Sequence, residues 1–170
     1  MNIVLIGYRG AGKSAVGKRL AERLRREFVD IDDLIEERQG APISDLVKSQ
    51  GWEGFRDMEK RVIQEISRED ELVIAPGGGA VIDAENVSSL KRNGLIIWLK
   101  ANAQVLRQRL EQDPRTPSSR PTLTGKGVLE EFEEVMGKRN PYYAKAADVE
   151  FDTSALDLDA VVERVYSIIQ

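Results

Sequence analysis

A glycine-rich stretch ending in lysine and serine has the residue types and spacing that most directly predict chemistry. It runs from Gly7 to Ser14, reads Gly-Tyr-Arg-Gly-Ala-Gly-Lys-Ser, and matches the pattern G-x-x-x-x-G-K-[ST]. In such a loop successive backbone N–H groups point into one concavity, and the helix that follows adds partial positive charge. Lys13 would reach the β- and γ-phosphates of a nucleotide, and the Ser14 hydroxyl would ligate Mg²⁺. The alternative is an ordinary glycine turn.

The flanking sequence favours a phosphate loop over a plain turn. Residues 2–6 form an apolar run typical of a buried strand, and apolar residues recur at helical spacing from Val16 to Leu24. A strand, a glycine loop and a helix in succession are the context in which this motif binds phosphate. The residues expected to contact the nucleotide here are Gly10, Ala11, Gly12, Lys13, Ser14 and Ala15.

Two aspartates, Asp30 and Asp32, lie at and directly after the end of the second predicted strand, residues 28–31. Alternation along a strand places Asp30 and Asp32 on the same side, near its carboxyl end. Two acids that face a triphosphate suit Mg²⁺ support and the orientation of an acceptor hydroxyl. The alternative is a helix N-cap, because aspartate is favoured where a helix starts. We predict that Asp33 has this capping role.

Two further patterns are weaker when taken alone. Arg56 and Glu59 lie three residues apart on a predicted helix and could simply pair with each other on its surface. Three glycines, at residues 77–79, follow the apolar strand 72–75. Glycines after a buried strand indicate either a turn that needs positive φ or a backbone that another group approaches closely. Their N–H groups could contact a ligand.

The least regular stretch, residues 112–127, combines prolines, glycines, serines and several cations. Long loops in compact domains are often lids, and a lid carrying Arg120 could close on a phosphoryl group and exclude water. Plain surface disorder is the alternative. On the helix before this loop, Arg107 and Arg109 would, as isolated charges, form a solvated face.

Apolar runs that alternate with helical patterns must position these residues. The predicted strands are 2–6, 28–31, 72–75, 95–99 and 148–151. The predicted helices are 13–26, 31–38, 43–49, 54–68, 84–92, 102–112, 127–137 and 155–168. This alternation predicts an α/β fold, a three-layer αβα sandwich with a five-stranded parallel sheet, and ligands beyond the carboxyl ends of its strands. Pro141 is expected to separate two helices.

Composition narrows the function classes. The chain has 170 residues, which favours one domain over residues 1–170. A net charge of −4 argues against a nucleic-acid surface, and no apolar run is long enough to span a membrane. The sequence has no cysteine and no histidine, so thiolate metal sites and cysteine nucleophiles are excluded, and a general base must be a carboxylate, lysine or tyrosine. We expect no signal peptide and a cytoplasmic location.

Taken together, the order and spacing of these motifs resemble those of shikimate kinase, a small phosphate-loop family of the nucleoside-monophosphate-kinase-like type. The motifs that carry the resemblance are the phosphate loop, Asp30-Ile31-Asp32, Phe55-Arg56, Gly77-Gly78-Gly79-Ala80-Val81, Arg120-Pro121 and Lys138-Arg139-Asn140-Pro141-Tyr142-Tyr143. Each later motif is weak alone, but the match runs over almost the full length. The resemblance implies a phosphate-loop kinase fold with a mobile lid over about residues 112–127.

The resemblance also implies a reaction, the transfer of the ATP γ-phosphoryl group to the 3-hydroxyl of shikimate. ATP and Mg²⁺ are the implied cofactors, shikimate is the small-molecule partner, and the enzyme is expected to be a monomer. Asp32 would hold the acceptor hydroxyl, as a base or only as an orienting group, and Asp30 would lie near Mg²⁺.

Further roles follow from the same resemblance. Arg56 and Arg139 would bind the shikimate carboxylate, with Gly78 and Gly79 as further substrate contacts. Arg120 would meet phosphate, and Arg109, or else Arg107, would lie near adenine.

Two other functions stay open from the sequence. One is a kinase for another small polyol acid, such as gluconate, on a similar scaffold. The other is a nucleotide-binding switch without acceptor chemistry. Arg56 and Arg139 argue against the switch, because a switch has no carboxylate to hold.

Overall fold

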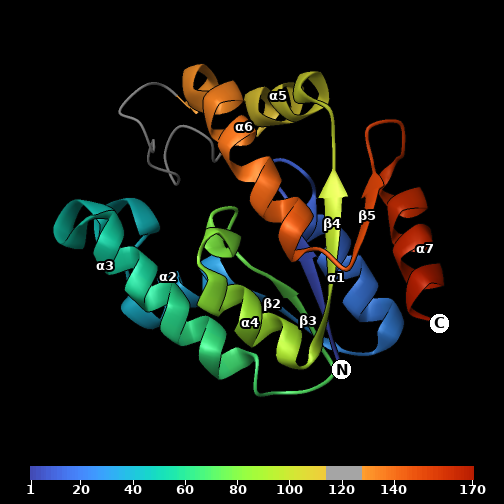
Figure 1. The fold of residues 1–170 in the computed structure, drawn as a ribbon, viewed down its shortest axis with the longest axis horizontal. Coiled ribbons are helices and arrows are strands. Elements are labelled where there is room, and N and C mark those ends of the chain that lie inside the picture. The colour runs from blue at the N-terminus through green and yellow to red at the C-terminus, as the bar shows by residue number, and fades with distance from the viewer. Residues whose placement is uncertain (114–127) are drawn as a thin grey trace.

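The structure, a computed structural model, describes residues 1–113 and 128–170. Its centre is a sheet of five strands in the order β2-β3-β1-β4-β5, in which every neighbouring pair runs parallel (Figure 1). The strands are β1 (Asn2–Ile6), β2 (Glu27–Asp30), β3 (Leu72–Ala75), β4 (Gly94–Lys100) and β5 (Val149–Asp152). The predicted five-stranded parallel sheet is therefore confirmed.

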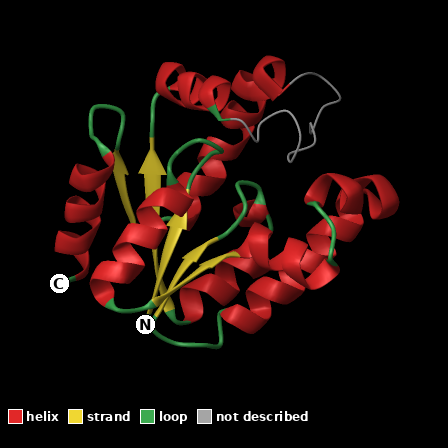
Figure 2. Ribbon diagram, turned by 180° about the vertical axis from the view of Figure 1, so that it is seen from behind, coloured by secondary structure: helices red, strands yellow, loops and turns green. Residues whose placement is uncertain are grey.

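Helices cover both faces of this sheet. They are α1 (Lys13–Leu24), α2 (Ile31–Gln39), α3 (Ile43–Ile66), α4 (Ala84–Arg92), α5 (Ala103–Gln112), α6 (Val128–Ala146) and α7 (Leu158–Ile169), with a short 3₁₀ turn, η1 (Ala80–Ile82). Helix α1 packs against α7 on one face, and α3 packs against α4 on the other (Figures 1 and 2). The three-layer αβα sandwich is confirmed. No helix in the described ranges combines the length and the apolar composition of a bilayer-spanning segment.

The strand order decides where a ligand can bind. Strands β1 and β3 are buried along their whole length, as expected of central parallel strands that are covered on both faces. These two strands are neighbours, yet the connection from β1 crosses one face to β2 and that from β3 crosses the other to β4. A crevice at the carboxyl ends of two such strands is where open α/β sheets bind ligands.

One predicted helix break is confirmed and another is wrong. The segments predicted as separate helices at 43–49 and 54–68 both form within α3, and a sharp break at Gly51, whose φ is +72°, separates them. The expectation that Pro141 separates two helices is wrong, because α6 continues through it to Ala146. A proline inside a helix costs about 3 kcal/mol. Here an unbroken buried stripe outweighs that cost, formed by Phe132, Val135, Arg139, Tyr143 and Ala146.

Candidate active site

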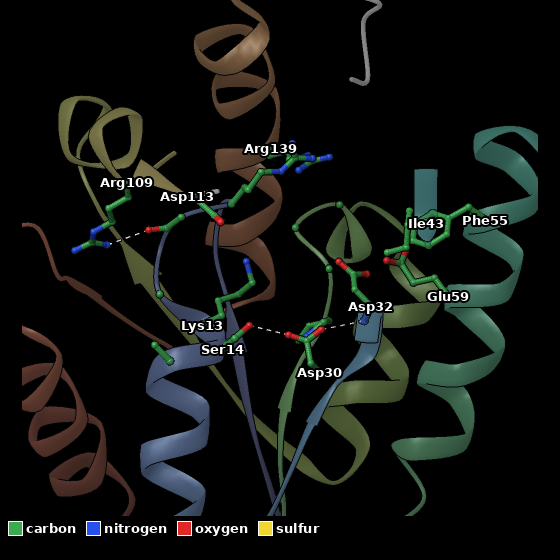
Figure 3. Close-up of a pocket in the computed structure, with 18 of the residues that line it drawn as sticks. Lys13, Ser14, Asp30, Asp32, Ile43, Phe55, Glu59, Arg109, Asp113 and Arg139 are labelled. Atoms are coloured by element: carbon green, nitrogen blue, oxygen red, sulfur yellow. Dashed lines mark hydrogen bonds between the residues drawn. The ribbon is translucent and has the colours of Figure 1, made fainter. Parts of the chain in front are cut away.

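A cavity of about 270 Å³ opens at the carboxyl ends of the central strands (Figure 3). The phosphate loop follows β1, the aspartates end β2, and the glycine triplet follows β3, so three predicted motifs meet at this edge. The predicted site residues that line it are Gly10, Gly12, Lys13, Ser14, Ala15, Asp30, Asp32, Arg56, Gly78, Gly79, Arg109 and Arg139. Ala11 is buried in the core instead, and Arg120 lies outside the described residues.

The phosphate loop has the geometry of an anion site. Its backbone is left-handed at Gly10 and Gly12, with φ values of +83° and +89°, a conformation that glycine adopts readily. Gly12 precedes α1 without a capping side chain, so no cap takes up the first N–H groups of that helix. The Lys13 ammonium lies over the loop and donates to the carbonyl oxygens of Gly7 at 2.7 Å and Tyr8 at 3.2 Å.

Asp30 links the phosphate loop to α2. Its Oδ1 accepts from the backbone N–H groups of Asp32 at 3.1 Å and Asp33 at 3.3 Å, while its Oδ2 accepts from the Ser14 hydroxyl at 2.7 Å. The N-cap of α2 is therefore Asp30, and the prediction that Asp33 is the cap is wrong. Because the cap ends β2 at residue 30, Asp32 lies in the first turn of a helix and not on a strand. Strand alternation therefore does not explain their placement, although both carboxylates line the cavity.

Asp32 lies beside a second carboxylate, that of Glu59 on α3 (Figure 3). Gly77 separates them: a Cβ built on this glycine would come within 2.9 Å of Asp32 Oδ1 and 2.8 Å of Glu59 Oε2. Any side chain at residue 77 would therefore displace one of the two acids. A glycine at this position lets the backbone pass between two negative groups.

Glu59 forms an ion pair with Arg56, at 2.8 Å between Oε1 and Nη1, and is fully buried. The two residues do pair, as one interpretation held, but at the cavity and not on the surface. Burial raises the pKa of Glu59, and the neighbouring Arg56 opposes that rise. The Arg56 guanidinium also lies 5.4 Å from the ring centre of Trp52 and 5.3 Å from that of Phe55.

Glu59 was missed as a site residue, although its position carries a signal. It lies on the same face of α3 as the buried Phe55, Val62 and Ile66. An acid within such an apolar stripe needs a partner, because burying an unpaired charge is costly. Arg9, within the phosphate loop, is another lining residue that was not singled out.

The glycine triplet lies against two guanidinium groups. A Cβ on Gly79 would overlap Arg56 Nη2 and would lie 3.1 Å from Arg139 Nη2, and one on Gly78 would lie 2.9 Å from Arg139 Nη1. None of the three glycines has positive φ, so close approach and not turn geometry explains them. Arginine side chains from α3 and α6 thereby converge on one short piece of backbone.

The two arginines of α5, the helix before the predicted lid, lie in different places. Arg109 lines the cavity and donates to the carbonyl oxygen of Gly10 at 3.1 Å. Arg107 is 54% exposed and pairs with Glu111 on the same helix. Of the two residues proposed to lie near adenine, the structure therefore places only Arg109 at the phosphate loop.

Comparison with known proteins identifies the family of this chain. The family model for shikimate kinase matches residues 9–170. A shikimate kinase of Symbiobacterium thermophilum is 41% identical over 170 residues, which cover 100% of this chain and 97% of that protein. The chain belongs to the shikimate kinase family. A shikimate kinase of Legionella pneumophila is also 41% identical, over 164 residues that cover 96% of this chain and 91% of the relative.

A solved structure agrees with this membership of the shikimate kinase family. The shikimate kinase from Acinetobacter baumannii in complex with shikimate superposes with a TM-score of 0.90 at 33% identity, over 99% of this chain and 92% of the other. The chain is thus an ATP-dependent kinase of the fold predicted from its sequence. The reaction of this family is the predicted one, so the gluconate-kinase and switch alternatives lose their support.

Proposed function

We propose that this chain phosphorylates the 3-hydroxyl of shikimate with ATP in a cavity that has a nucleotide half and an acid half. One observation supports this division: the phosphate loop and the two arginines, Arg56 and Arg139, line a single cavity but come from different elements. Here "nucleotide half" means residues 7–15 with Asp30 and Arg109. "Acid half" means Asp32, Arg56, Glu59, residues 77–79 and Arg139.

In the nucleotide half, the loop amides and Lys13 would hold the phosphates, and Arg109 would lie near adenine. Mg²⁺ fits the donor set of Ser14 and Asp30, because it prefers hard oxygen ligands. No cluster of three or more acidic side chains that could hold a metal occurs in the described part of the chain. Mg²⁺ sites with one or two protein ligands typically take the rest from water and phosphate. When bound, the ion would neutralise charge on the β- and γ-phosphates.

In the acid half, two guanidinium groups suit one carboxylate. Arginine's planar fork holds a carboxylate through paired charge-assisted hydrogen bonds. Glu59 holds Arg56 through their ion pair. The backbone of Gly78 and Gly79 lies close against the guanidinium groups of Arg139 and Arg56. We infer that the substrate carboxylate is bound between Arg56 and Arg139, with the glycine amides as further contacts.

Between the halves, Asp32 would orient the acceptor hydroxyl toward the γ-phosphoryl group. Phosphoryl transfer requires mainly positioning and charge stabilisation, so Asp32 need not be a strong base. Lys13 would stabilise the developing charge together with Arg120. Arg120 belongs to the proposed lid, at about residues 112–127, most of which lies outside the described residues.

We also propose a single domain over residues 1–170 that acts as a monomer in the cytoplasm. One continuous core cluster, which takes in side chains from β1 to α7, supports the single domain. In the described ranges few large apolar side chains are exposed, namely Met1, Ile82, Tyr142 and Ile168, which supports the monomer. The use of ATP as phosphoryl donor supports the proposed cytoplasmic location.

An ADP-release assay across a panel of acceptors tests the proposal. We expect ADP formation that requires Mg²⁺ and is stimulated by shikimate, but not by gluconate or nucleoside monophosphates. Stimulation by gluconate alone would defeat the acceptor assignment. ATP hydrolysis at the same rate with and without any acid would defeat the kinase function and favour a switch.

A further inference from the structure

Tyr143 is a buried polar residue at the acid half that the proposed function does not use. It lies on α6, one helical turn after Arg139, and only 1% of its surface is exposed. Its hydroxyl donates to the carbonyl oxygen of Gly78 at 2.6 Å, and its ring packs against Trp98 with centroids 5.5 Å apart. A buried phenol therefore forms a direct bond from α6 to the glycine triplet.

The bond acts at the meeting point of the two halves. A Cβ on Gly78 would lie 2.9 Å from Arg139 Nη1, 3.5 Å from the Tyr143 hydroxyl and 3.7 Å from the carbonyl oxygen of Gly7. Gly7 opens the phosphate loop, and its carbonyl accepts from Lys13. Gly78 is thus enclosed by a carboxylate-binding arginine, the tyrosine and the start of the nucleotide half.

The glycine triplet is conformationally flexible, and this hydrogen bond can restrict it. Glycine is favoured at 78 and 79 because a Cβ there would push against the guanidinium groups of Arg56 and Arg139. Consecutive glycines, however, leave the peptide between them unusually free to rotate. The carbonyl of Gly78 and the N–H of Gly79 belong to the same planar trans peptide and point in opposite directions. A hydrogen bond that fixes the carbonyl therefore also fixes the direction of that N–H.

We propose that Tyr143 is a positioning residue for the acid substrate: its hydroxyl holds the peptide between Gly78 and Gly79 in the orientation that the acid half requires. This inference rests on the proposed function, in which Arg139 and the glycine amides contact the acid. Tyr143 itself touches no substrate. It acts through the two groups that its hydroxyl contacts, the Gly78 carbonyl and the Arg139 side chain, and the nucleotide half does not depend on it.

The hydroxyl is suited to this role at every physiological pH. Burial raises the pKa of Tyr143 to about 12, against an opposing effect of Arg139. The phenol therefore keeps its proton and remains a donor. Its effect should be the same across the neutral range.

The test is Tyr143→Phe, which removes the donor and keeps the ring against Trp98. We expect the KM for shikimate to rise about tenfold, because a buried acceptor is left without its donor, while the KM for ATP stays within about twofold. Thermal unfolding gives a second readout. Shikimate should raise the Tm of the variant less than that of the wild type, whereas ADP should raise both equally.

Tyr142→Phe is the matched control. The neighbouring tyrosine is 43% exposed, so the same chemical change should leave both KM values and both Tm shifts unaltered. If Tyr143→Phe lowers the Tm but changes neither KM, or changes both equally, the tyrosine is merely structural and the inference is wrong.

Arg139→Ala separates this inference from the proposed function. If Arg139→Ala raises the KM for ATP and not that for shikimate, the division of the cavity fails, and the inference fails with it. If Arg139→Ala behaves as proposed while Tyr143→Phe leaves the KM for shikimate unchanged, only the role of Tyr143 is overturned.

Discussion

The two halves of the cavity are built in different ways. The nucleotide half comes mainly from one short stretch of chain, residues 7–15, and it presents backbone N–H groups, the Lys13 ammonium and the guanidinium groups of Arg9 and Arg109. The acid half is assembled from α2, α3, the turn after β3, and α6, and it presents side chains that contact one another (Figure 3). A local loop shaped by its glycines faces a surface whose parts are distant in sequence.

This difference has a physical consequence for substitutions. In the nucleotide half many donors are peptide N–H groups, which substitutions other than proline leave in place, so we expect the loss of the Lys13 side chain to have the largest effect there. In the acid half two groups are held by neighbouring side chains: Arg56 by Glu59, and Gly78 by Tyr143. A change there should spread to its neighbours but should stop at the boundary with the nucleotide half.

Lys13→Ala should have the largest effect. We expect the Lys13 ammonium to contact the γ-phosphoryl group during transfer. Its loss should therefore lower kcat by about a thousandfold, as when a key hydrogen-bond donor to the transition state is removed. Shikimate affinity, measured by calorimetry without nucleotide, should not change. Lys18→Ala, an exposed lysine on the same helix, is the control. Appreciable turnover by Lys13→Ala would contradict the phosphate-loop assignment.

Arg56→Ala should be nearly as severe, but on the other substrate. Removing one partner from a desolvated charge pair costs about 2–4 kcal/mol, so the KM for shikimate should rise by roughly 30- to 1000-fold. The KM for ATP should barely change. Arg61→Ala, an exposed arginine on the same helix, should behave as wild type. Equal losses for both substrates would show that the cavity is not divided as proposed.

The same contrast explains what could be predicted from the sequence. The phosphate loop was predictable because its residues are contiguous and follow an apolar strand, so local rules suffice. The buried pairing of Glu59 was not, because periodicity identifies an apolar stripe but not what lies opposite it. Pro141 was misjudged for a related reason: the local rule that proline ends helices is outweighed by packing against distant residues. The lid falls outside the described residues, and its role stays a prediction.

Gly79→Ala sharpens the comparison with a single added methyl group. The new Cβ would overlap Arg56 Nη2, the far end of a flexible side chain, so the arginine can move and the cost is intermediate. We expect the KM for shikimate to rise by about tenfold, the amount that about 1.4 kcal/mol of strain produces. Steady-state kinetics in both substrates measures this.

Gly137→Ala is the control for that substitution. A Cβ at this glycine of α6 meets nothing within 4 Å, so the change should leave catalysis unaltered and stabilise the helix by up to about 1 kcal/mol. If the two alanine variants have the same KM for shikimate, the close contact between the triplet and Arg56 does not matter for binding.

The smallest expected effect is a pH dependence of stability that comes from the acid half. Burial raises the pKa of Glu59, so the folded protein keeps this proton to a higher pH than the unfolded chain, whose glutamates titrate near about 4.3. Where only the unfolded chain has lost the proton, stability must fall as the pH rises. Glu59→Gln removes this titration. Its free energy of unfolding in urea, relative to wild type, should therefore increase as the pH rises from about 4.3 toward neutrality. Glu53→Gln, exposed on the same helix, should show no such trend, and a difference that instead decreases with pH would mean that Arg56 lowers the pKa of Glu59 more than burial raises it.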